Sequence, residues 1–291
     1  MRPPQRVLIV VHPDRPRALE MAAVCSAGLR GRGVEVVTTP DTRAGLDLPS
    51  ATADEHVDLV VVFGGDGSIL RGSDVARAHD VPLLGVNLGH VGFLAELEEE
   101  QAAGIVDHIA AGTFTIQERM TLDVTVMREG SAVASTWALN EASIEKAARE
   151  RMIHVVAEVD GRPLSEWGCD GVLCATPTGS TGYAWSAGGP VVWPTVDAML
   201  LVPVSAHALF ARPMVVASST EVALEMLRGS PRAVMWCDGQ RLVPLQEGDR
   251  VEVVRGHRPI RLARLHDSLF VDRLVAKFEL PVKGWRGRGP R

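Results

Sequence analysis

The stretch VVFGGDGSIL, residues 61–70, holds the residues whose types and spacing most plainly suggest chemistry. An apolar run leads into a polar loop and a second apolar run follows; the loop consists of Gly64, Gly65, Asp66, Gly67 and Ser68. Glycines adopt backbone angles closed to other residues and let a ligand approach main-chain N–H groups. A strand, a glycine turn and a helix start therefore indicate a phosphate-binding loop. The spacing matches neither G-x-G-x-x-G nor GxxxxGK[ST], so neither standard nucleotide loop is predicted.

Asp66 needs an explanation, because an acid among phosphate-binding amides repels phosphate. Two chemical roles fit it: it accepts the proton of a hydroxyl that attacks a phosphoryl group, or it holds the Mg²⁺ that bridges the phosphates. Both roles belong to phosphoryl transfer and neither belongs to hydride transfer. The local sequence leaves a third alternative equally open, in which Asp66 only caps the following helix.

A second dense set of polar side chains lies in CDGVLCATPTGSTGYAWSAGGP, residues 169–190. Three hydroxyl residues, two glycines and a tyrosine occur together in residues 178–183, directly after a strand-like run. This composition predicts a cluster of hydrogen-bond donors at a helix amino terminus, although a Ser/Thr-rich capped turn is the plain alternative. Asn140 and Glu141, which we expect to close a strand, form a third polar element that singly indicates only a solvated strand end.

Length and charge narrow the classes of function. With 291 residues, the chain is long enough for two domains at roughly 150 residues each. Its net charge of −6 argues against a nucleic-acid binder that relies on a broad basic face. An anionic ligand must then be bound by a few local groups, such as backbone N–H groups, arginine side chains or a metal ion.

The cysteine pattern and the apolar runs indicate the compartment. Cys25, Cys169, Cys174 and Cys237 show no CxxC spacing and are too sparse for a disulfide framework, so we expect reduced core thiols. The first apolar run, residues 7–11, is too short for a signal peptide, and no stretch approaches the roughly 18 apolar residues of a membrane span. We therefore expect a soluble, cytoplasmic protein that involves no membrane.

Strand and helix patterns alternate in the first part of the chain. Strands are predicted at residues 6–11, 34–39, 57–63 and 81–87. Helices are predicted at residues 15–33 and from the glycine loop to about His79. Continuous apolar strands of this kind are typical of a parallel sheet covered on both faces. The pattern predicts an α/β N-terminal domain with a doubly wound parallel sheet over residues 1–115.

The pattern changes after about residue 115. Residues 119–146, 152–177 and 251–265 alternate apolar and polar side chains between turn signals. This predicts a mainly antiparallel β C-terminal domain over residues 116–267, sandwich-like or multi-sheet. A helix is predicted near the end, in a segment of residues 268–291 that we expect to pack back on the first domain and to finish in a frayed basic tail.

Together these segments resemble the NAD kinase family. The resemblance rests on GGDG after a strand, on the Asn-Glu pair, and on the highly specific TPTGST and SAGGP, residues 176–181 and 186–190. It extends to GVNLGHVGFLAE, HALFARP, CDGQ and RLVAKF, so it covers nearly the whole chain, and it is closest to the actinobacterial branch. Two positions depart from the family pattern: Ser68 stands where threonine is usual, and Gly182 where alanine is usual.

The resemblance implies an enzyme that transfers a phosphoryl group from ATP, with polyphosphate as an alternative donor, to the 2′-hydroxyl of the adenosine ribose of NAD, giving NADP. It implies Mg²⁺ carried by the nucleotide, with no metal ligand assigned on the protein. Asp66 is then the catalytic acid–base residue, and Gly64, Gly65, Gly67 and Ser68 form the phosphate loop. The positions that match the family's dinucleotide site are Asp66, Gly67, Asn140, Glu141, Asp170, Thr178, Thr181, Gly182, Tyr183, Ser186 and His207.

Two other functions are also compatible with these sequence features. A diacylglycerol-type lipid kinase of the same superfamily has a GGDG-type loop, but it needs an apolar groove where this chain has a hydroxyl-rich turn. A non-catalytic NAD-binding sensor is the second alternative, although such a protein would gain from a neutral residue in place of Asp66. The resemblance also implies a homodimer or homotetramer, which fits a β domain rich in apolar strands and poor in aromatic residues.

Overall fold

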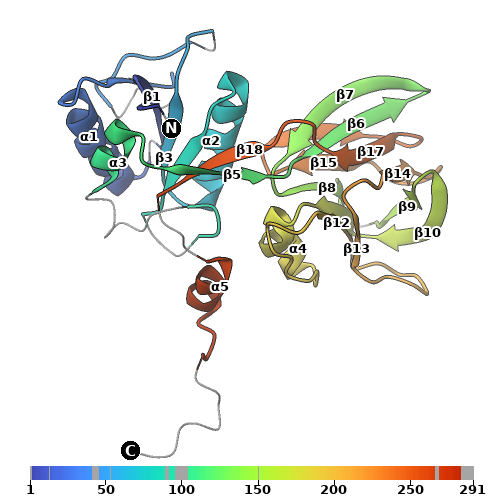
Figure 1. The fold of residues 1–291 in the computed structure, drawn as a ribbon. Helices are drawn as coiled ribbons and strands as arrows, with labels where there is room; N and C mark the ends of the chain where they lie inside the picture. Colours follow the sequence, from blue (N-terminus) through green and yellow to red (C-terminus); the bar gives the residue numbers. More distant parts are fainter. Residues whose placement is uncertain are drawn as a thin grey trace, which may run out of the picture. The chain divides into compact units, whose positions relative to one another are not determined.

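The computed structural model describes residues 2–12, 14–40, 46–52, 54–88, 92–95, 104–149, 151–265 and 269–282. The chain forms two compact units (Figure 1). The first consists of Met1–Glu118 together with Ile260–Arg291, and the second of Arg119–Pro259. The first unit therefore uses both ends of the chain.

The first unit is built on a six-stranded sheet with strand order β2-β1-β3-β4-β18-β5. Its strands are β1 (Arg6–Val11), β2 (Glu35–Thr38), β3 (Leu59–Phe63), β4 (Leu83–Val86), β5 (Thr115–Arg119) and β18 (Ile260–Arg264). β1 pairs in parallel with β2 and β3, and β4 pairs in parallel with β3 and β18. Every residue of β3 and β4 is buried, as expected for strands covered on both faces.

Helices cover both faces of this sheet. They are α1 (Pro16–Arg30) and α3 (Ile105–Ala111) on one face and α2 (Asp66–His79) on the other, whereas the C-terminal helix α5 (Phe270–Phe278) packs on residues 93–95. α1 and α3 share one apolar core with alternate residues of the strands, among them Ile9 and Val61. α2 packs on the strand residues between these, so closely that a Cβ at Gly72 would lie 2.2 Å from a methyl group of Val62. The predicted α/β fold of the N-terminal part is confirmed.

The second unit consists of two six-stranded antiparallel sheets, ordered β10-β9-β14-β17-β6-β7 and β13-β12-β11-β8-β15-β16. The first sheet contains β6 (Leu122–Arg128), β7 (Ser131–Ala138), β9 (Ile153–Val159), β10 (Arg162–Cys169), β14 (Val222–Met226) and β17 (Arg250–Arg255). The second contains β8 (Glu141–Lys146), β11 (Gly171–Ala175), β12 (Ala198–Val204), β13 (Met214–Ala217), β15 (Ala233–Cys237) and β16 (Arg241–Leu245). Both sheets bury alternate side chains in one core, with Trp167 as its largest member. The predicted antiparallel β part is confirmed.

Two local expectations were wrong, and a third concerns residues outside the described part of the chain. Residues 251–265 are not one antiparallel segment, because β17 lies in the second unit whereas β18 pairs in parallel with β4. Alternation identifies a strand but does not choose its partner. Asn140 and Glu141 do not close a strand: Leu139 and Asn140 form the bend between β7 and β8, and Glu141 opens β8. The predicted basic tail, 283–291, lies outside the described residues.

The four cysteines are free and buried, as predicted. Burial raises the pKa of each thiol to about 12, so none is a reactive thiolate near neutral pH. Within the described part of the chain, no helix combines the length and the apolar character needed to cross a membrane.

Candidate active site

The glycine loop joins β3 to α2 and depends on a conformation that only glycine adopts easily. Gly64 has a φ of +149°, and a Cβ on it would lie 2.5 Å from the hydroxyl oxygen of Ser68. The N–H of Gly64 donates to the carbonyl of Val86 on the neighbouring strand at 2.9 Å, which anchors the loop to the sheet. α2 begins directly after this turn, with Gly65 at the N-cap and no side chain capping it. The first amides of α2 are thus free of side-chain caps, as in an anion-binding helix terminus.

Asp66 does not cap α2, so the structural alternative for this residue is wrong. Its carboxylate instead accepts hydrogen bonds from two backbone N–H groups of a distant segment, Phe93 at 3.0 Å and Leu94 at 3.1 Å. Gly92 allows this approach, because a Cβ there would lie 2.5 Å from Oδ1 of Asp66. The half-buried carboxylate is therefore held in a fixed position beside the loop.

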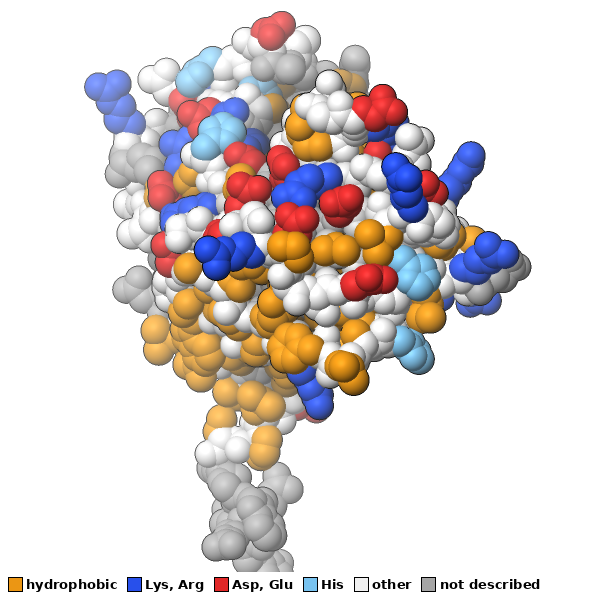
Figure 2. Space-filling model, turned by 90° about the vertical axis from the view of Figure 1, so that its right-hand side faces the viewer, with side chains coloured by type: hydrophobic (Ala, Val, Ile, Leu, Met, Phe, Trp, Pro, Cys, Tyr) orange, Lys and Arg blue, Asp and Glu red, His pale blue; other side chains and the backbone are white. Residues whose placement is uncertain are grey.

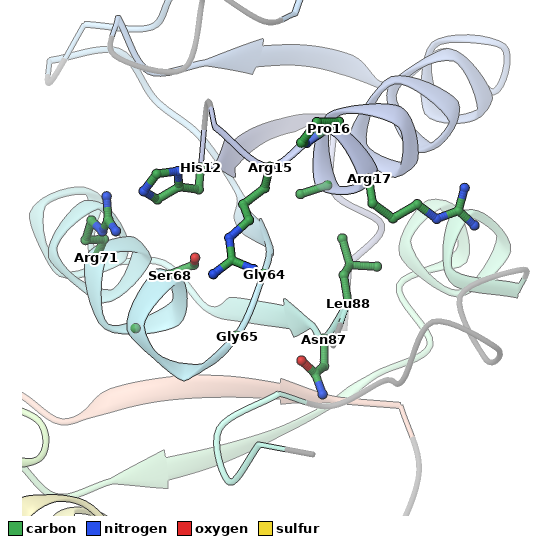
Figure 3. A pocket seen from close by; sticks show the side chains of 12 residues that line it. His12, Arg15, Pro16, Arg17, Gly64, Gly65, Ser68, Arg71, Asn87 and Leu88 are labelled. Atoms are coloured by element: carbon green, nitrogen blue, oxygen red, sulfur yellow. The ribbon is translucent and has the colours of Figure 1, made fainter. Parts of the chain in front are cut away.

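A cavity of about 420 Å³ opens beside the same loop (Figure 3). It lies where β1, β3 and β4 end, and its walls include Gly64, Gly65, Gly67, Ser68 and Asn87. β1 continues through α1 to β2 on one side, whereas β3 continues through α2 to β4 on the other. The cavity thus lies at the point where the direction of winding reverses, the usual ligand position in an open α/β sheet. Asp66 is not among the residues that line it.

Basic side chains give this cavity its charge. His12, Arg15 and Arg71 line it, and Figure 3 shows Arg15 reaching toward the glycine loop whereas Arg17 points away. α1 also begins at the cavity, with a proline at its start and no acidic residue in its first turn. Two helix amino termini and cationic side chains around one space favour an anion with several negative oxygens, such as a polyphosphate chain.

His12, Arg15 and Arg71 were not predicted as site residues from the sequence. A signal existed in the predicted strands: His12 directly follows the strand predicted at residues 6–11, and Asn87 ends the one predicted at 81–87. The carboxyl ends of parallel strands meet at one edge of a sheet, so the two residues can be expected to lie there together. Arg71 lies on the helix that Asp66 begins. None of these residues belongs to a recognisable motif, so only the combination of the predicted sheet with its topology could have singled them out.

In the second unit, the TPTGST turn packs on the Asn140 bend. Thr176 donates from its hydroxyl to the carbonyl of Leu139 at 2.5 Å and from its N–H to the carbonyl of Asn140 at 2.8 Å. A Cβ on Gly179 would lie 2.0 Å from the carbonyl oxygen of Asn140, so only glycine permits this contact. Two predicted ligand segments that are distant in sequence are thereby brought together.

Asp238 holds the other side of that bend. Its buried carboxylate accepts the N–H groups of Leu139 at 2.8 Å, Asn140 at 2.7 Å and Glu141 at 3.3 Å. Arg241 completes the arrangement with a 2.6 Å hydrogen bond to Asp238, while its guanidinium lies 4.4 Å from the ring centre of Trp137. CDGQ, residues 237–240, is part of the resemblance to the NAD kinase family, but no role was predicted for Asp238 from the sequence.

Glu141 is buried against Asp238 and carries an altered proton affinity. Burial, followed by the charge of Asp238, raises the pKa of Glu141 to about 8, although the N–H of Tyr183 opposes the shift. Burial also raises the pKa of Asp238, and the N–H groups of Leu139, Asn140 and Glu141 together with Arg241 act against that rise. Oε2 of Glu141 and Oδ1 of Asn140 are buried and make no hydrogen bond in the structure, which marks this bend as a place for a polar ligand.

The remaining predicted site residues of the second unit lie around short helical turns and strand ends. η3 (Thr178–Thr181) and α4 (Tyr183–Ser186) carry most of them, and Gly182 lies between, where a Cβ would come within 3.1 Å of Oε2 of Glu141. The hydroxyls of Thr181 and Ser186 donate to backbone carbonyls within these turns, whereas the side chain of Tyr183 is 37% exposed.

Two further predicted residues belong to other segments of the second unit. Asp170 precedes β11 and pairs with Lys146 at 2.5 Å. His207 is exposed, and its backbone N–H donates to the carbonyl of Gly168 at 2.8 Å. No observation assigns a ligand to either residue, so their roles remain predictions.

Known protein families match this chain over most of its length. The family of ATP-NAD kinase N-terminal domains matches residues 7–114, and the family of ATP-NAD kinase C-terminal domains matches residues 139–265. The chain belongs to the NAD kinase family. NAD kinase 2 of Streptomyces avermitilis is 51% identical over 97% of this chain and 96% of its own length, and the NAD kinase of Mycobacterium leprae is 46% identical over 97% of both.

Solved NAD kinase structures have the same fold. The yeast NADH kinase complexed with NADH superposes with a TM-score of 0.84, at 23% identity, over 100% of this chain and 90% of its own. The NAD kinase from Archaeoglobus fulgidus in complex with ATP superposes with a TM-score of 0.71, at 24% identity, over 94% of this chain and 98% of its own. At this level of identity the likeness concerns the fold of NAD kinases alone.

Proposed function

We propose that this protein is an NAD kinase that transfers the γ-phosphoryl group of ATP to the 2′-hydroxyl of the adenosine ribose of NAD and so produces NADP. Family membership supports this activity, as do relatives named NAD kinase that share about half of their residues with this chain. Phosphoryl transfer requires mainly positioning and charge stabilisation, so it can be performed by a loop, a few cations and one carboxylate.

The separation of charge around the glycine loop is the observation that carries the mechanism. Gly64, Gly65, Gly67 and Ser68 face a basic cavity suited to the donor phosphates, whereas Asp66 is held away from that cavity by Phe93 and Leu94. Phosphate oxygens can thus meet amides and arginines without meeting the carboxylate. Asp66 is left to orient the acceptor hydroxyl and take its proton as the new P–O bond forms.

Mg²⁺ fits this site as a metal carried by the nucleotide. The described residues contain no group of three His, Cys, Asp or Glu side chains that could hold a metal ion. Mg²⁺ commonly uses one or two protein carboxylates and completes its shell with phosphate oxygens and water. Here phosphate oxygens and water would supply the ligands, and the ion would neutralise charge that develops on the transferred group.

For NAD itself we propose the site around the Asn140 bend. The unsatisfied oxygens of Asn140 and Glu141 would accept hydrogen bonds from the dinucleotide, and protonated Glu141 can also donate one. Tyr183 has its ring partly exposed beside this bend, where an aromatic group with a polar tip suits a nucleoside. The proposed NAD site also includes Asp170, Thr178, Thr181, Ser186 and His207.

We also propose that the enzyme acts as a homo-oligomer in the cytoplasm. Four reduced, buried thiols fit a reducing compartment. The second unit exposes several large apolar side chains, among them Trp185, Trp193, Leu209 and Phe210. Figure 2 shows hydrophobic side chains gathered on the lower part of one face and charged ones on the upper part. Exposed apolar surface of this kind favours association, and light scattering that gives a monomer mass with full activity would contradict it.

The decisive experiment mixes the purified protein with NAD, ATP and Mg²⁺ and measures NADP with an NADP-specific dehydrogenase. We expect NADP to accumulate, and we expect none without Mg²⁺. Parallel reactions with polyphosphate and with NADH define the donor and the acceptor. Phosphorylation of diacylglycerol in place of NAD would instead indicate a lipid kinase, and calorimetric NAD binding without NADP would indicate a sensor.

A further inference from the structure

The C-terminal helix α5 contacts the short segment that holds Asp66. Arg273 of α5 donates hydrogen bonds from Nη1 to the carbonyl of Phe93 at 3.1 Å and to the carbonyl of Ala95. The ring of Phe93 also packs between two rings of α5, with centroids 5.8 Å from Phe270 and 6.0 Å from Phe278. Residues 92–95 form no helix or strand, so these anchors replace the backbone pairing that a regular element would supply.

A single peptide group connects Arg273 to Asp66. The carbonyl of Phe93, which accepts from Arg273, and the N–H of Leu94, which donates to Oδ1 of Asp66, belong to the same peptide unit. This unit is planar and trans, so its oxygen and its hydrogen point in opposite directions. The guanidinium and the carboxylate therefore hold opposite ends of one rigid group.

Two physical effects pass through this peptide group. The first is geometric: movement of the Phe93 carbonyl rotates the Leu94 N–H and displaces the carboxylate that it holds. The second is electrostatic, because a cation on the carbonyl oxygen polarises the peptide and strengthens the N–H as a donor. Both effects make Asp66 depend on a residue that is distant in sequence and is not among those that line the phosphate cavity.

We propose that Arg273 is a positioning residue for the catalytic carboxylate of Asp66. This inference rests on the proposed function, because it concerns the same carboxylate. Arginine suits the role, since Nη1 donates to both carbonyl oxygens and the planar guanidinium keeps this nitrogen in a fixed orientation, whereas lysine offers a point charge on a flexible stem. α5 thus contributes to catalysis through residues 92–95 without touching a substrate.

The test compares Arg273→Met with two companions. Arg273→Lys keeps the positive charge and N–H donors but loses the planar guanidinium, and Lys277→Met removes an exposed charge from the same helix. A displacement on the order of 1 Å at a reacting group can cost about 10²-fold. We expect Arg273→Met to lower kcat by about 10- to 100-fold with KM values for NAD and ATP within about threefold, Arg273→Lys to recover most of kcat, and Lys277→Met to equal the parent.

A double variant separates positioning from general damage. If Arg273 acts through Asp66, adding Arg273→Met to Asp66→Asn should lower the residual kcat little further, because the carboxylate that it positions is already gone. An equal fold-loss in both backgrounds would overturn the inference, as would parental kcat in Arg273→Met. Should Arg273→Met be unfolded at the assay temperature, Arg273→Gln, which removes the charge and keeps an N–H donor, takes its place alone and with Asp66→Asn, and the same comparison decides.

Gly92→Ala provides an independent check. The new Cβ would lie on Oδ1 of Asp66, so the carboxylate must shift while Arg273 and its contacts remain. We expect kcat to fall with unchanged thermal unfolding, and parental kcat would contradict a strict requirement for the position of Asp66. A parent protein that makes no NADP would overturn the proposed function together with this inference, whereas NADP formation with parental kcat in Arg273→Met overturns the inference alone.

Discussion

The glycine loop of the first unit and the Asn140 bend of the second are both sharp turns associated with an aspartate, but the two aspartates differ in their surroundings. Asp66 is half-buried and accepts two backbone N–H groups. Asp238 is buried, accepts three backbone N–H groups and is also neutralised by Arg241. A carboxylate that keeps access to solvent can exchange a proton during turnover, whereas a buried and neutralised one serves to fix the backbone.

The glycine loop and the Asn140 bend also differ in the groups that would face a ligand. Around the glycine loop, main-chain amides and arginine side chains face an open cavity that suits a highly charged anion. Around the Asn140 bend, the unsatisfied atoms are buried oxygens, one of them on a carboxyl group that holds its proton at neutral pH. These surroundings suit a polar ligand with hydroxyl groups rather than one whose recognition depends on charge.

The largest expected effect tests the reactive aspartate. Asp66→Asn keeps the shape and loses the ability to accept a proton, so turnover should fall by about 10²–10⁴-fold while calorimetric NAD binding stays within a few fold. Asp107→Asn is a matched control, since Asp107 also lies in the first turn of a helix of this unit. Turnover within tenfold of the parent in Asp66→Asn would remove the distinction between a reactive and a structural aspartate.

A large effect on the free energy of unfolding is expected for Glu141, beside the Asn140 bend. Because the folded-state pKa of Glu141 is raised from 4.5 to about 8, the unfolded chain releases the Glu141 proton at lower pH than the folded protein does. The free energy of unfolding therefore falls as pH rises through this window, at roughly 1.4 kcal/mol per pH unit for one group. Glu141→Gln removes this titration, so the variant should gain stability relative to the parent between pH 5 and 8.5, by a few kcal/mol.

Urea unfolding of both proteins at pH 5 and pH 8.5 measures this difference. Stability curves that run parallel across this range would show that Glu141 is already ionised in the folded protein, and the contrast between charged and protonated sites would then be wrong.

An intermediate effect concerns the phosphate cavity. Arg15→Met removes a cation directed at the glycine loop, so the KM for ATP should rise about tenfold, the size expected for a lost charge-assisted hydrogen bond, while the KM for NAD changes little. Arg17→Met is the control, because Arg17 points away and pairs with Glu20 at 3.0 Å on the surface. A larger change in the KM for NAD than for ATP would assign this cavity to the other substrate.

The smallest expected effect sharpens the assignment of the second unit. Tyr183→Ala removes a partly exposed ring beside the Asn140 bend, so the KM for NAD should rise several-fold and by more than the KM for ATP. Steady-state kinetics with each substrate varied in turn measures both. Equal changes in the two constants would show that Tyr183 only packs on its neighbours.

Much of the fold and part of the site could be predicted from sequence because their signals are local. The helix α2 (Asp66–His79) was predicted because a glycine turn directly after a buried strand is a local signal for the start of a helix. The strands of the first unit were recognisable because buried parallel strands are continuously apolar. The partner of residues 260–264 was not predictable, since the same pattern suits either sheet and the choice depends on the packing of the whole unit.

By itself the sequence determined the glycine loop, the two kinds of sheet, the polar TPTGST turn and the family to which the chain belongs, because each depends on neighbouring residues or on a contiguous motif. Only the tertiary structure decided that Asp66 is held by Phe93 and Leu94 rather than by its own helix, that Asp238 fixes the Asn140 bend, and that Arg15 and Arg71 line one cavity. The physical reason is that a residue's pattern specifies its local conformation and burial, whereas its hydrogen-bond partners come from segments that meet only when the chain has folded.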